Sequence, residues 1–68
     1  MKHYVIRIHP GGEPIVHHED DDPVQAEAYV RNVRSEYGGK FIICTGAKRR
    51  NELLKDPTKA TGRERRGW

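Results

Sequence analysis

Residues 2–9 alternate between apolar and polar positions, which is the pattern of a strand buried on one side. One side of the extended chain holds Tyr4, Ile6 and Ile8. Period-two spacing of β-branched and aromatic residues predicts a half-buried strand. Two prolines and two glycines within residues 9–14 predict a turn. A second strand over about residues 15–19 should return beside the first as an edge strand.

The clearest pattern in the chain is that of a helix beginning after Asp22. Asp22 is a favoured N-cap residue, and Pro23 is a favoured first residue of a helix. Apolar side chains then recur at helical spacing as one stripe, made of Ala26, Tyr29, Val30, Val33 and Tyr37. The pair Gly38-Gly39 predicts a left-handed C-terminal stop. The pattern therefore predicts a helix of about 15 residues.

Residues 41–45 form a short, nearly continuous apolar run that Gly46 closes. Such a run is typical of a central strand covered on both faces. After the helix, this strand can pair with the first one. We therefore expect a small α/β domain of the α+β type over residues 1–47. Its order is β-β-α-β, with a three-stranded sheet in the order 2-1-3 and one helix on one face. Residues 48–55 could add a weak helical turn.

A single helix covers only one face of a sheet. If the side of the first strand that holds Tyr4 faces the helix, Val5 and alternate residues of the third strand face away. Those alternates are Ile42 and Cys44, or Phe41 and Ile43. This outer face is too apolar to remain in water. Two alternatives stay open: residues 53–54 fold over it, or a partner covers it.

Charge and apolar content change together near residue 47. Residues 1–47 hold 5 basic and 7 acidic residues, whereas residues 48–68 hold 8 basic and 3 acidic residues. Residues 48–68 contain only four apolar residues, too few to offset the entropy of ordering. We therefore expect a basic, partly disordered tail over residues 48–68, flexible from about Lys55 onward.

Clustered lysine and arginine residues on a flexible arm can neutralise phosphates and gain affinity by counterion release. The candidate nucleic-acid-binding residues are Lys48, Arg49, Arg50, Lys55, Lys59, Arg63, Arg65, Arg66 and Trp68. The ring of Trp68 could stack on an unpaired base. The first hypothesis is a non-enzymatic module that binds nucleic acid or a nucleoprotein complex. A solubilising tail, or a tail bound in an acidic protein groove, would explain the same charge.

A second hypothesis places the chain among protein-binding accessory proteins or inhibitors, for example of phage or mobile-element type. The contacts would come from the uncovered sheet face and the acidic corner before the helix. These partner-binding candidates are Val5, Arg7, Ile42, Cys44, Glu19, Asp20 and Asp21. A third hypothesis pairs two uncovered faces in a homodimer.

The chain contains no catalytic motif such as Gly-x-Ser-x-Gly, a phosphate loop or a dinucleotide fingerprint. Its one cysteine, Cys44, excludes an internal disulfide and lies in an apolar strand, so we expect a buried, inert thiol. No enzymatic activity and no cofactor are predicted. No apolar run approaches about 18 residues, so no membrane segment is expected. Without a secretory signal, the expected location is the cytoplasm.

His17 and His18 precede a run of acidic residues, and imidazole with carboxylate is a common metal-ligand set. Neighbours on a strand point to opposite faces, however, so the two rings should not bind one ion. A polar strand end before an acidic helix start explains the segment better, because negative charge complements the helix dipole. No metal site is predicted.

Overall fold

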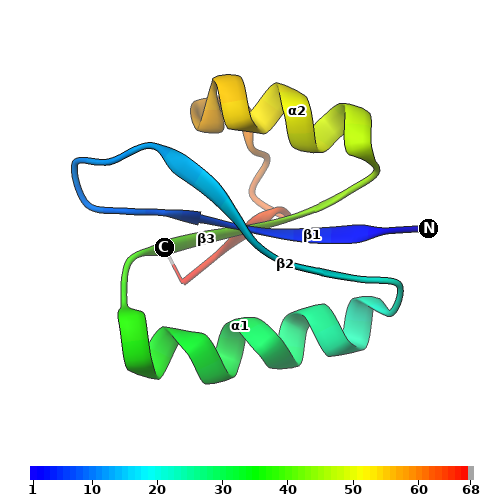
Figure 1. The fold of residues 1–68 in the computed structure, drawn as a ribbon, viewed down its shortest axis with the longest axis horizontal. Coiled ribbons are helices and arrows are strands. Elements are labelled where there is room, and N and C mark those ends of the chain that lie inside the picture. Colours follow the sequence, from blue (N-terminus) through cyan, green and yellow to red (C-terminus); the bar gives the residue numbers. More distant parts are fainter. Residues whose placement is uncertain (68) are drawn as a thin grey trace.

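An antiparallel sheet separates two helices in the computed structural model, which describes residues 1–67 (Figure 1). The elements in chain order are β1 (His3–Ile8), β2 (Pro14–Asp20), α1 (Pro23–Tyr37), β3 (Lys40–Thr45), α2 (Ala47–Lys55), the 3-10 turn η1 (Pro57–Lys59) and β4 (Arg65–Arg66). The strand order is β2-β1-β3-β4. The α+β class is therefore confirmed, together with the order of the first three strands. Within the described residues, neither helix has the length and apolar character needed to cross a membrane.

Helix α1 has the length and both ends that the sequence predicts. The carboxylate of Asp22 accepts a hydrogen bond from the backbone N–H of Val24 at 2.9 Å. The helix ends at Gly38, whose φ of 66° lies in the left-handed region that residues with a Cβ rarely adopt. Its buried residues are Ala26, Val30 and Val33. Tyr37, the last residue of the predicted stripe, is exposed.

The sheet has a hydrophobic core on each face. Residues paired across antiparallel strands point to the same side. Val5 pairs with Ile43 and packs against α1, whereas Tyr4 pairs with Cys44 on the side of α2. The condition considered above, in which Tyr4 and its alternates face the first helix, is therefore not met, because α2 covers that side of β1. The more apolar side of β1, with Tyr4, Ile6 and Ile8, lies under α2, and the alternation shows which side is more apolar but not which helix covers it.

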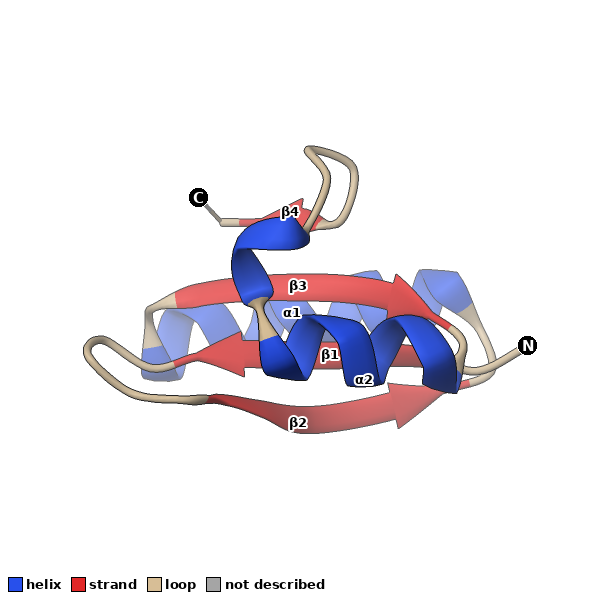
Figure 2. Ribbon diagram, turned by 90° about the horizontal axis from the view of Figure 1, so that it is seen from above, coloured by secondary structure: helices blue, strands red, loops and turns tan. Residues whose placement is uncertain are grey.

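The segment beyond residue 47 is folded against the sheet. Helix α2 lies over β1 and β3 (Figure 2). Leu53 is fully buried, Ala60 is 5% exposed, and β4 pairs with residues 41–42 of β3. The predicted single helix and three-stranded sheet are thus wrong in detail, and residues 47–67, most of which were expected to form a basic tail, hold α2, η1 and β4. A few apolar residues are enough to hold this segment in place, because they pack against a face of the sheet that is itself apolar.

Candidate nucleic-acid interface

The basic residues of the C-terminal segment are distributed over several elements. Helix α2 holds Lys48, Arg49, Arg50 and Lys55, η1 holds Lys59, the next loop holds Arg63, and β4 holds Arg65 and Arg66. Because α2 and α1 lie on opposite sides of the sheet, the helix cations gather in a layer separate from α1 (Figure 1). Trp68 lies outside the described residues.

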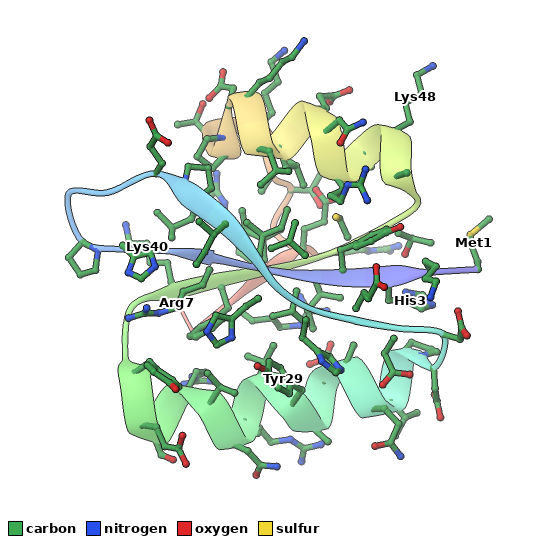
Figure 3. The ribbon with its side chains drawn as sticks, viewed as in Figure 1. Met1, His3, Arg7, Tyr29, Lys40 and Lys48 are labelled. Carbon is green, nitrogen blue, oxygen red and sulfur yellow. The ribbon has the colours of Figure 1, made fainter. Side chains whose placement is uncertain are left out.

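Lys48 and Lys55 mark the outer surface of α2. They are seven residues apart, which is two helical turns, so both occupy the same side of the helix about 10.5 Å apart along its axis. Both side chains are exposed, and Lys48 extends away from the sheet (Figure 3). Neither lysine forms a salt bridge with any residue in the described part of the chain. These two ammonium groups are therefore available to an external anion.

Arg50 is held in place without a carboxylate. Its guanidinium lies 4.8 Å from the centroid of the Tyr4 ring, and its Nη2 donates a hydrogen bond to the Asn51 side-chain oxygen at 3.0 Å. A cation held over an aromatic face keeps its full charge. Arg50 therefore adds a fixed positive charge on the side of α2 that faces Tyr4, opposite the side that holds Lys48 and Lys55.

Arg49 connects α2 to the segment that follows the helix through hydrogen bonds and ion pairs. Its Nε and Nη2 donate to the two carboxylate oxygens of Glu64 at 3.0 and 2.8 Å, and Nη1 pairs with Glu52. Nη2 also donates to the backbone carbonyl of Lys59 at 3.0 Å. The Arg49 guanidinium holds the pKa of Glu64 below its ordinary value, and Glu64 in turn raises the pKa of Arg49. The charge of Arg49 is therefore neutralised within the fold.

The third carboxylate of the segment, Asp56, begins η1. Its side chain accepts hydrogen bonds from the hydroxyl and the backbone N–H of Thr58, and these bonds lower its pKa. Asp56 also lies in the electrostatic field of Lys59. Each of the three acidic residues beyond residue 47 thus has a partner inside the segment.

The two arginines of β4 point to opposite sides of the sheet. Arg66 pairs with Phe41 on the α1 side and binds the carboxylate of Glu27 at 2.7 Å, whereas Arg65 pairs with Ile42 on the α2 side. Arg66 is therefore neutralised by α1. We use the name cationic surface for the basic residues of α2, η1 and the following loop that form no salt bridge in the described part of the chain: Lys48, Arg50, Lys55, Lys59 and Arg63. The sequence identified these five, but no spacing signal separated them from Arg49 and Arg66.

The residues expected on an uncovered sheet face are buried. Val5 and Ile42 have no exposed area, and Cys44 is 2% exposed. The register also divides them, because Val5 lies under α1 whereas Ile42 and Cys44 lie under α2. Burial raises the pKa of the Cys44 thiol to about 11. Of the two alternatives that the sequence left open for this face, the structure shows the one in which residues 53–54 fold over it.

Arg7 lies in the α1 layer. Its side chain reaches the C-terminal end of that helix (Figure 3), where Nη2 donates to the carbonyl of Tyr37 at 3.1 Å and Nε to that of Gly38 at 3.4 Å. Cations at this end of a helix interact favourably with its dipole. These contacts allow Arg7 to be buried. Its burial could not be predicted from the sequence, because an arginine in a strand is expected to be exposed.

The acidic corner is largely occupied by local contacts. The Lys2 ammonium lies 3.7 Å from the Glu19 carboxylate and 4.0 Å from that of Asp21. Asp20 accepts a hydrogen bond from the backbone N–H of Asp22 at 2.9 Å, which lowers its pKa, and it pairs with His18. These contacts shape the entry to α1.

The two neighbouring histidines do not point to opposite faces as the sequence suggests. A β-bulge in β2 turns both His17 and His18 towards α1. Even so, within residues 1–67 no three His, Cys, Asp or Glu side chains are arranged to hold a metal ion.

Comparisons with known proteins add no family assignment. No protein-family model, no curated protein and no solved structure matches the chain. The charged residues of α2 and of the segment that follows it are therefore the features of this chain that bear on its function.

Proposed function

We propose that the protein is a non-enzymatic module that binds nucleic acid, alone or within a nucleoprotein complex, through the cationic surface. The observation that supports this proposal is that the acidic residues beyond residue 47 have partners within the segment, whereas some of its basic residues do not. The three carboxylates are engaged by Arg49 and at the start of η1, while Lys48 and Lys55 keep unpaired charges on the outer side of α2. A polyphosphate chain gains affinity at such a surface by releasing its counterions.

The ordered segment changes how binding would work. On a flexible arm each cation loses conformational freedom when it meets a phosphate, whereas a helix presents its cations at fixed spacing. Contacts of this kind position a nucleic acid without distinguishing its sequence, because they touch phosphates rather than bases. We therefore expect binding that depends steeply on salt and weakly on base sequence.

Fluorescence anisotropy with labelled duplex and single-stranded oligonucleotides, at several salt concentrations, tests this proposal. Each phosphate neutralised on a duplex contributes about −0.9 to the slope of log K against log salt. The five cations predict a slope of about −4.5 on this basis. Absence of binding to every probe, or a loss of affinity below about tenfold between low and physiological salt, would contradict the proposal.

Charge-matched variants locate the surface. Lys48→Gln with Lys55→Gln should weaken binding uniformly across sequences and reduce the slope by about 2. The control, Arg31→Gln with Arg34→Gln, removes the same charge from the exposed side of α1 and should leave the slope unchanged. Equal effects of the two double variants would place binding elsewhere. Substitution is preferable to truncation, because removing the chain end would also remove the buried Ala60.

A further inference from the structure

A β-bulge in the edge strand β2 places two neighbouring histidines on one side of the sheet. The register between β1 and β2 shifts after Val5, which pairs with His18, and His17 is the extra residue. The ring of His17 also lies on the α1 side, with its centroid 5.8 Å from that of Tyr29. In a regular strand the two rings would point to opposite faces. The bulge thus concentrates imidazole groups between β2 and α1.

Tyr29 of α1 contacts both histidines (Figure 3 labels its position). Its hydroxyl lies 2.9 Å from Nδ1 of His17, and its ring stacks on that of His18 with centroids 4.0 Å apart. In contrast, Ile15 and Val16, the aliphatic residues of β2, remain 43% and 41% exposed. Strand β2 is therefore held to α1 mainly through aromatic and imidazole contacts.

The groups that face His17 are cationic or neutral. From the β1 side come the guanidinium of Arg7 and the His9 ring that it contacts at 2.9 Å; from β2 comes His18. Helix α1 contributes the phenols Tyr29 and Tyr37, and β3 contributes the neutral ring of Phe41. Asp20 pairs with His18, and no carboxylate in the described part of the chain pairs with His17.

Protonation of His17 would therefore disturb its surroundings in two ways. A neutral imidazole with its proton on Nε2 accepts a hydrogen bond from the Tyr29 hydroxyl at Nδ1, whereas an imidazolium can only donate, so this hydrogen bond would have to reverse its direction with the Tyr29 oxygen as acceptor. The added charge would also face Arg7 without a compensating carboxylate. Consistently, burial and then the charge of Arg7 lower the pKa of His17 below its ordinary value.

We propose that the imidazole–tyrosine contacts between β2 and α1 form a pH-dependent latch, which proton uptake by His17 opens at the β2 edge while the rest of the sheet stays folded. The direction follows from linkage, because the closed state binds this proton less readily than the open state. The latch is fully stable above the ordinary histidine pKa of 6.5 and weakens as the pH falls through the lowered value. This device is independent of nucleic-acid binding at the cationic surface.

Amide hydrogen exchange on the intact protein, at about pH 7.5 and about pH 5.5, tests the latch after correction for intrinsic exchange rates. We expect protection of the β2 amides to fall about tenfold at the lower pH, while protection of the β3 core amides changes less than about twofold. An unchanged β2 would overturn the proposal. A parallel loss in β2 and β3 would overturn it as well, because it would indicate global unfolding.

Two variants assign the proton. His17→Gln keeps an acceptor for the Tyr29 hydroxyl but cannot take up a proton, so the pH response of β2 should disappear. His3→Gln is the matched control, because His3 contacts Thr45 at 3.1 Å outside this cluster, and the response should persist. If His17→Gln destabilises the fold, the NMR titration of the His17 ring in the wild type decides. Its midpoint must lie below the ordinary value and coincide with the loss of β2 protection; separate midpoints would refute the latch.

Discussion

The two faces of the sheet are covered by different means. Helix α1 has 15 residues, a side-chain N-cap and three buried aliphatic residues. Helix α2 has 9 residues, has Gly46 as its N-cap and therefore no side-chain cap, and buries one leucine completely. The strand residues under α2 are apolar and include Tyr4 of β1 and Cys44 of β3. The strand residues under α1 also include the buried Arg7.

This difference shows what a long helix and a short helix each need in order to pack stably on a sheet. A long helix with a continuous apolar stripe provides enough buried area to tolerate polar groups beneath it, provided that they find hydrogen-bond partners. A short basic helix supplies little apolar area, so it depends on an apolar strand face and on ion pairs at its rim. In this protein the Arg49–Glu64 pair serves that purpose. The surface left over on the short helix is accordingly rich in cations.

The largest expected effect tests the cover on the α2 side. Leu53→Ala removes the one side chain of α2 that is fully buried and should lower the free energy of unfolding by about 3 kcal/mol, measured by urea denaturation. Cys44, whose pKa is raised to about 11, should resist thiol reagents in the wild type and react faster in this variant. Val30→Ala on the α1 side removes fewer carbons and should cost less. A loss below about 1 kcal/mol for Leu53→Ala would show that α2 is not packed on the sheet.

A smaller effect is expected from the rim of the same face. Glu64→Gln breaks the paired hydrogen bonds with Arg49 and should lower the urea midpoint at neutral pH more than Glu52→Gln, whose carboxylate is more exposed. Because the pKa of Glu64 is lowered in the fold, its contribution is present above the ordinary value of 4.5 and is lost as the pH falls through the lowered value. The difference between Glu64→Gln and the wild type should therefore shrink in acid. A constant difference would assign the effect to packing rather than charge.

The smallest expected effect concerns the N-terminus of α1. Asp22→Ala removes the cap on the Val24 N–H and should destabilise the protein by about 1 kcal/mol in thermal or urea unfolding. The neighbouring Asp21→Ala is the control, because Asp21 forms only an exposed pair with Lys2 and should change little. Equal effects of the two variants would mean that the general negative charge, and not the cap, stabilises this helix end.

Much of the α1 side of the fold followed from local patterns. The Asp22-Pro23 start, the glycine stop and the apolar stripe each depend on residues within a few positions of one another, and the structure contains the helix that they predict. The candidate interface was predictable only as a set of cations. Arg49 and Glu64 lie 15 residues apart, and Arg66 and Glu27 lie 39 apart, so no local spacing showed which cations the fold neutralises.

The sequence by itself determined the elements up to residue 45. The spacing of apolar residues, the helix caps and the turn residues all depend on positions that lie close together in the sequence. Only the tertiary structure decided which side of β1 faces α1, that α2 covers the other side while β4 adds a fourth strand, and that a bulge turns His17 and His18 the same way. These outcomes depend on strand register and on contacts between distant residues. A shift of one position in register exchanges the two faces of a strand, so the face that each helix covers depends on pairing between residues far apart in the sequence.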